Sequence, residues 1–207
     1  MPLVYQQNIN AHTKLGVWHI AETEDFFLEK VPLQNNITHP HKRLQHLAGR
    51  LVLSELYEDF PIRLIQIADT KKPFLADEAF HFSISHCGDY AAAIVSKENR
   101  VGVDIEIPQP KIELIKNKFL KEGEQQMLQE LNIDFLQALT MAWSVKETLF
   151  KWYALGNVDF KENLHINSAM VNDNQFLFDC IFQKEQKISL QVKGFFFNGN
   201  CLSWVVS

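Results

Sequence analysis

The middle of the chain contains the feature that most restricts its fold. The segment 101–107, VGVDIEI, alternates strictly between apolar residues and residues that are polar or glycine. Successive side chains of a strand point to opposite faces, so Asp104 and Glu106 share one face and the apolar residues share the other. Pro108 and Pro110 follow at once and end the strand. We therefore expect one unit to end here and a second to begin.

Hydrophobic periodicity assigns elements to both sides of this break. An apolar stripe of helical spacing covers 40–59, with Pro40 in the first turn. Strands are expected from about Phe80 to Ser85 and at 90–96. The predicted order is helices, strands, helices and strands. This order fits two α+β halves of about a hundred residues each.

Three helices and a strand-rich region are expected after the prolines. The predicted helices are 113–120, 122–131 and 134–156, the last capped by Gly156. From about Leu164 the sequence is strand-like, in FLFDCIF, KISLQVKGFFF and CLSWVVS. Asn198-Gly199 is a turn signal within this region. The predicted domains are 1–108 and 109–207.

Bulk properties exclude several classes of protein. A net charge of −5 gives no general attraction to nucleic acid. No apolar run approaches the ~20 residues that span a bilayer, and the first twenty residues are expected to be a mature N-terminus rather than a signal peptide. Cys87, Cys180 and Cys201 form no CxxC pair, which argues against a disulfide framework or zinc site. A reducing cytoplasm is the expected location.

Asp104 and Glu106 are candidate metal ligands. Their Cα atoms should lie roughly 7 Å apart on one face, so both carboxylates can reach one hard cation such as Mg²⁺. Gly102 on the same face leaves room for a ligand. The strand alone favours the alternative, a half-buried strand whose polar face meets water.

The helix predicted at 134–156 carries a second candidate pair, Glu147 and Lys151. Its apolar arc is expected to comprise Leu136, Leu139, Trp143, Phe150 and Ala154. Glu147 lies at the margin of this arc, where a carboxylate is costly unless it is paired or bound to metal. The alternative is an ordinary Glu147–Lys151 pair four residues apart on a helix surface.

Ser85 and His86 end a predicted strand before Gly88, and their donors suit a phosphate. A Ser-His nucleophile pair is disfavoured, because adjacent strand residues point to opposite faces and no GxSxG elbow occurs. Basic residues lie upstream in the 40–59 helix and in a Lys-Lys-Pro turn. They are Lys42, Arg43, His46, Arg50, Lys71 and Lys72. Taken alone, they are ordinary surface charge.

Four blocks in order resemble the Sfp-type 4′-phosphopantetheinyl transferases of the holo-acyl-carrier-protein synthase superfamily. They are KKPF, FSISHCG, VGVDIE and WSVKETLFK, which together span 71–151. The segment HKRLQHLAGR looks like an upstream helix of the same family. The resemblance implies an α+β fold of two similar halves about a pseudo-twofold axis, with the active site at their interface.

The resemblance also implies roles for individual residues. Asp104, Glu106 and Glu147 would hold Mg²⁺, Lys151 would contact the α-phosphate of coenzyme A, and Glu147 would deprotonate the carrier serine. The adenosine end of coenzyme A would be held by four residues of the N-terminal half. They are Arg43, Lys72, Ser85 and His86, with Lys42 or Arg50 as alternatives to Arg43.

The implied reaction moves phosphopantetheine from coenzyme A to a serine of an apo acyl, peptidyl or polyketide carrier protein and releases 3′,5′-ADP. Fatty-acid and secondary-metabolite synthesis both remain open. We expect a monomer, no nucleic acid and no membrane partner. A catalytically inactive coenzyme A-binding homologue is the alternative. A generic nucleotide enzyme is disfavoured, because neither a P-loop nor GxGxxG occurs.

Overall fold

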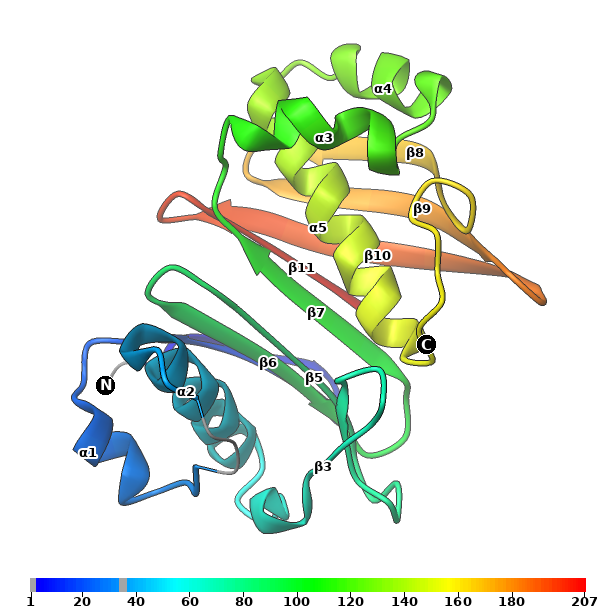
Figure 1. The fold of residues 1–207 in the computed structure, drawn as a ribbon. Coiled ribbons are helices and arrows are strands. Elements are labelled where there is room, and N and C mark those ends of the chain that lie inside the picture. Colours follow the sequence, from blue (N-terminus) through cyan, green and yellow to red (C-terminus); the bar gives the residue numbers. More distant parts are fainter. Residues whose placement is uncertain (1–2, 34–36) are drawn as a thin grey trace. The chain divides into compact units, whose positions relative to one another are not determined.

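The computed structural model describes residues 3–33 and 37–207 (Figure 1). Residues 1 and 2, part of the predicted N-terminus, lie outside the described residues. The chain divides into two compact units, Met1–Val103 and Asp104–Ser207. This division falls inside strand β7 (Val101–Glu106), whereas the predicted domains divide after the first proline that follows it.

Unit 1 begins with strands, so the predicted order, which began with helices, is wrong at this end. The elements are β1 (Leu3–Asn10), β2 (Thr13–His19), α1 (Glu24–Leu28), α2 (Pro40–Leu56), η1 (Ile62–Leu64), β3 (Gln66–Ile67), β4 (Pro73–Phe74), β5 (His81–Cys87) and β6 (Tyr90–Ser96). The sequence patterns did not predict β1 and β2, because β1 is largely exposed and most of β2 is buried on both faces. Neither strand therefore shows a clean period of two.

The main sheet of unit 1 is antiparallel, in the order β1-β2-β6-β5, and α2 packs on it. The helix begins at Pro40 as predicted and buries Leu47, Leu51 and their neighbours. Gly49 allows a close approach to the sheet, because a Cβ there would lie 2.6 Å from the side chain of Ile84. The middle of α2 therefore lies close to β5.

Unit 2 contains helices followed by strands, as predicted. They are α3 (Lys111–Phe119), α4 (Glu122–Gln129), α5 (Phe135–Tyr153), β8 (Leu164–Asn172), β9 (Gln175–Gln183), β10 (Lys187–Phe197) and β11 (Asn200–Val206). The sheet runs β7-β11-β10-β9-β8. Asn198 and Gly199 have φ of 47° and 76°, which confirms the predicted turn between β10 and β11.

Helix α5 lies across the sheet of unit 2, most closely on β11 (Figure 1). Its fully buried apolar face comprises Ala138, Leu139, Met141, Ala142, Val145 and Leu149, with Trp152 only slightly exposed. The predicted arc is therefore wrong in orientation, because Trp143 and Phe150 are only half-buried. Both rings pack on Phe160, in the loop after α5, rather than in the sheet core.

The end of α5 also differs from the prediction. The C-cap residue is Ala154, in the left-handed region with φ of 73°, and not Gly156. The helix therefore ends earlier than predicted, before the loop that carries Phe160. No helix in the described part of the chain is both long and apolar enough to cross a membrane.

Candidate functional site in unit 2

Asp104 lies on β7 beneath α5 and is only 2% exposed. Lys151, near the end of α5, donates a hydrogen bond from Nζ to Asp104 Oδ1 at 2.6 Å. The polar face of β7 at Asp104 is thus covered by a helix, and the water-facing alternative is wrong there. The side chain of Lys151 retains 24% exposure.

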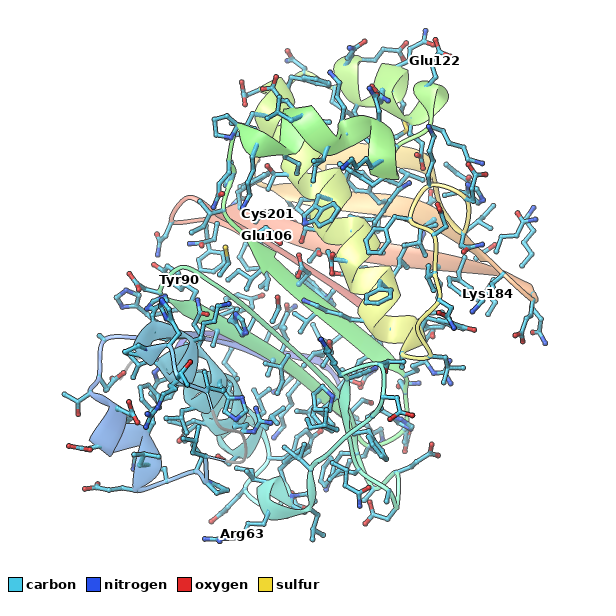
Figure 2. The ribbon with its side chains drawn as sticks, viewed as in Figure 1. Arg63, Tyr90, Glu106, Glu122, Lys184 and Cys201 are labelled. Atoms are coloured by element: carbon cyan, nitrogen blue, oxygen red, sulfur yellow. The ribbon has the colours of Figure 1, made fainter. Side chains whose placement is uncertain are left out.

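Glu106, two residues further along β7, is half-buried. Trp143 donates from Nε1 to Glu106 Oε1 at 3.1 Å. The Trp143 ring is packed edge-to-face on Phe119 at 5.1 Å and stacked on Phe160 at 5.6 Å between centroids. Figure 2 shows Glu106 on β7, with Cys201 on the neighbouring strand β11. The Glu106 carboxylate is therefore fixed by an aromatic side chain that is itself clamped.

Glu147 on α5 completes the group. Burial, together with the negative charges of Asp104 and, to a smaller extent, Glu106, raises the pKa of Glu147 to about 7. The Lys151 ammonium opposes this shift. Three carboxylates and one ammonium, drawn from β7 and α5, therefore lie within electrostatic reach of one another. Lys151 therefore forms an ion pair with Asp104 on β7, in addition to its electrostatic interaction with Glu147 on the same helix.

The chemistry of this group fits a hard divalent cation. Carboxylate oxygens are the protein ligands that Mg²⁺ prefers, and mutual repulsion among carboxylates is relieved by a cation. Among residues 3–33 and 37–207, no set of three or more His, Cys, Asp or Glu side chains is arranged to hold a metal ion. In this arrangement the Lys151 ammonium lies on Asp104, where a cation is expected.

A pocket of about 280 Å³ adjoins Glu106 and Trp143. Both polar and apolar side chains line it. The other lining residues are Ile107, Gln109, Lys111, Ile112, Ile115 and Thr140. The pocket therefore offers a carboxylate, an indole ring and an apolar wall from α3 within unit 2.

The four residues predicted to hold the adenosine end of coenzyme A all lie in unit 1. Ser85 and His86 occupy opposite faces of β5, where Ser85 is buried and His86 is exposed. Arg43 forms an ion pair with Glu24 of α1. Burial, together with the nearby positive charge of Arg100, lowers the pKa of Lys72 to about 8.

Arg50, which the sequence offered only as an alternative, is buried on α2 with 5% exposure. Its Nη1 lies 3.1 Å from His46 Nδ1, one helical turn earlier. Burial lowers the pKa of His46 to about 4, helped by the charges of Arg50 and His86. The structure therefore groups His86 with His46 and Arg50, and it places Arg43 with Glu24. The spacing of four residues between His46 and Arg50 was the available sequence signal.

Residues 100–200 match the sequence model of the 4′-phosphopantetheinyl transferase superfamily. Enterobactin synthase component D of Salmonella typhi is 34% identical over 116 residues, which cover 55% of this chain and 49% of that protein. The same component from Escherichia coli strain K12 is 33% identical, covering 53% and 54%. The 4′-phosphopantetheinyl transferase AcpT of Salmonella typhimurium is 32% identical, covering 53% and 58%.

The chain spans about half the length of the curated relatives it matches. The segment that matches the superfamily contains all of β7 and α5, and so all four charged groups of the site. Sequence match and site geometry therefore coincide on the same elements. On these grounds residues 100–200, about half of the chain, are similar to the 4′-phosphopantetheinyl transferase superfamily.

Proposed function

We propose that this protein transfers the 4′-phosphopantetheine group of coenzyme A to a serine of an apo carrier protein and releases 3′,5′-ADP. The reaction is of the holo-acyl-carrier-protein synthase type and depends on Mg²⁺. The observation that carries the proposal is the grouping of Asp104, Glu106, Glu147 and Lys151 on β7 and α5. Similarity to the 4′-phosphopantetheinyl transferase AcpT supports the same reaction class.

The three carboxylates Asp104, Glu106 and Glu147 would hold Mg²⁺ together with phosphate oxygens of coenzyme A. When bound, Mg²⁺ would neutralise charge on the phosphate oxygens, which is much of what phosphoryl transfer requires. Lys151 would exchange its Asp104 partner for the α-phosphate and hold that group as it leaves.

Glu147 would accept the proton of the carrier serine hydroxyl. A bond then forms between the serine oxygen and the β-phosphorus, and the bond from the β-phosphorus to the oxygen of the α-phosphate breaks. The electron pair leaves with 3′,5′-ADP. A pKa of about 7 in the ligand-free protein suits a general base that works near neutral pH.

The adenosine end of coenzyme A is assigned to unit 1. Lys72, Ser85 and His86 keep the roles implied by the resemblance. Arg43 is the first assignment for the 3′-phosphate, and Arg50 is the alternative. Arg50 contacts His46, which lies near His86, and this grouping supports the alternative. The two similar halves about a pseudo-twofold axis, with the active site at their interface, belong to this proposal, as does the carrier-protein role of the C-terminal half.

The class of carrier protein is to be identified by experiment. The name enterobactin synthase component D supports a carrier of secondary metabolism, and acyl, peptidyl and polyketide carriers should all be tested. The competing function is a homologue that binds coenzyme A without transferring anything. Retention of all four charged groups favours the transferase.

The test is the intact mass of an apo carrier protein after incubation with this protein, coenzyme A and Mg²⁺. A gain of about 340 Da that EDTA prevents is expected, and excess Mg²⁺ should restore it. Coenzyme A binding is measured in parallel by calorimetry. Binding without any mass gain on three carrier classes would favour the inactive homologue, and absence of both would refute the assignment.

A further inference from the structure

Lys146, the residue before Glu147 on α5, is completely buried. Its Nζ donates to Glu124 Oε2 at 2.9 Å, to the carbonyl oxygen of Phe119 at 2.5 Å and to that of Phe160 at 3.1 Å. A lysine ammonium has three protons, so these contacts use its full donor capacity. A fully satisfied buried ammonium of this kind fixes the groups around it in one geometry.

Glu124, the partner of Lys146, is equally well satisfied. Its carboxylate also accepts from the backbone N–H groups of Lys121 and Ile166, both at 2.7 Å. The network therefore joins the end of α3, the start of α4, the middle of α5 and β8. A buried ion pair is often no more stable than an apolar pair of the same volume. We therefore expect the Lys146–Glu124 ion pair to fix the geometry of the surrounding main chain more than it raises the free energy of unfolding.

The two carbonyl groups held by Lys146 belong to the two residues whose rings clamp Trp143. Phe119 packs edge-to-face on Trp143, and Phe160 stacks on it. Trp143 in turn donates to Glu106 Oε1. An unbroken series of contacts thus runs from the buried ammonium to a carboxylate of the candidate site, entirely within unit 2.

We propose that Lys146 is a positioning residue for Glu106: its ammonium fixes the main chain at Phe119 and Phe160, their rings fix Trp143, and Trp143 orients the carboxylate. Lys146 touches none of the proposed reacting atoms and is not catalytic. The metal-binding consequence rests on the proposed function. The orientation of Trp143 does not, and can be measured without metal.

The main test variant is Lys146→Met combined with Glu124→Gln. It removes both charges of the buried Lys146–Glu124 pair. The side-chain oxygen of the glutamine can still accept a hydrogen bond from the backbone N–H of Ile166. The matched control is Thr148→Val. Thr148 is another buried polar anchor of α5, bonded to Ser203 Oγ at 2.6 Å, with no link to Trp143. Any general loosening of α5 on its sheet should affect both variants.

Two readouts are needed. The first is the exchange rate of the Trp143 indole N–H in metal-free protein by ¹⁵N NMR, with the signal assigned by its loss in Trp143→Phe. The second is Mn²⁺ affinity by electron paramagnetic resonance in the presence of coenzyme A. The double variant should exchange this proton about tenfold faster and bind Mn²⁺ about tenfold more weakly. Thr148→Val should stay within about twofold of wild type in both.

A folded double variant that matches Thr148→Val in indole exchange would overturn the proposal. Should the double variant not fold, Phe160→Leu at a half-buried position tests the same series of contacts, and it should shift both readouts in the same direction by a smaller factor. Unchanged exchange in Phe160→Leu would equally overturn it. If wild type neither binds Mn²⁺ nor transfers phosphopantetheine, the proposed function fails, and indole exchange alone decides the role of Lys146.

Discussion

Unit 1 packs α2 on a four-stranded sheet and unit 2 packs α5 on a five-stranded sheet, but burial acts on charges of opposite sign at their candidate ligand-binding residues. On α2, burial lowers the pKa of Arg50 to about 10 and that of His46 to about 4, so positive charge is disfavoured. On α5, burial raises the pKa of Glu147 to about 7, so negative charge is disfavoured. Packing of a helix on a sheet therefore disfavours positive charge at Arg50 and His46 of unit 1 and negative charge at Glu147 of unit 2.

This difference indicates what each unit should bind. A buried charge is costly until a group of opposite sign approaches it. An anion would favour the protonated forms of Arg50 and His46, and a cation would favour the ionised form of Glu147. Coenzyme A phosphates and Mg²⁺ have the required signs.

The largest effect is expected for Asp104→Ala in unit 2. Loss of this buried carboxylate should reduce the transfer rate by at least about 10³-fold, because charge stabilisation at the phosphates is lost. Asp179→Ala, on β9 of the same unit, is the matched control and should keep the wild-type rate. Thermal melting should show both variants folded. A folded Asp104→Ala variant with normal transfer would refute the metal assignment.

Glu147→Gln should separate activity from stability. The transfer rate should fall by about 10²-fold or more with the loss of the base. Glu147 binds its proton more tightly in the folded protein, so the wild-type free energy of unfolding falls as pH rises from about 4.5 to about 7. Glutamine does not ionise, so the metal-free variant should be roughly 1–2 kcal/mol more stable at pH 8 and match wild type near pH 4.

Urea unfolding at the two pH values measures this difference. Mg²⁺ with coenzyme A should reduce it at pH 8 by stabilising wild type selectively. An equal stability of the two proteins at pH 8 would show that unit 2 does not disfavour negative charge, and the contrast between the units would be lost.

In unit 1, Arg50→Met and Arg43→Met should identify the arginine that binds the 3′-phosphate. Removal of the correct arginine should raise KM for coenzyme A by about tenfold with little change in kcat. The same variant should show no added penalty with 3′-dephospho-coenzyme A. Arg63→Met, at an exposed position of η1, is the control. An unchanged KM in both variants would remove the anion-binding role from α2.

The smallest effect is expected for Ala154→Gly, which changes stability without changing charge. Ala154 caps α5 with a positive φ that glycine adopts without strain. The free energy of unfolding should rise by about 0.5–1 kcal/mol in urea titration, with transfer unchanged. The same substitution at Ala142, inside α5, should destabilise by about 1 kcal/mol or more. Altered transfer in Ala154→Gly would mean that helix stability, and not charge alone, distinguishes unit 2.

Sequence patterns predicted the elements wherever local signals were strong. The bounds of β6 and β10 match the predicted segments, and α2 begins at the predicted proline. Patterns failed for β1 and β2, which lack clean alternation, and for the end of α5, which is capped by Ala154 in the left-handed conformation two residues before Gly156. The inward face of α5 was also misjudged, because a helix with apolar residues on several sides can pack in more than one orientation.

By itself, the sequence determined that Asp104 and Glu106 share a strand face, that Glu147 and Lys151 lie one turn apart on a helix, and that the motifs are those of this superfamily. Such relations depend on neighbours a few residues apart. Only the tertiary structure decided that Lys151 pairs with Asp104, that Trp143 holds Glu106 and that Lys146 is buried with Glu124. These partners are 22 to 47 residues apart in the chain, and they meet only because helices pack on a sheet in one particular register.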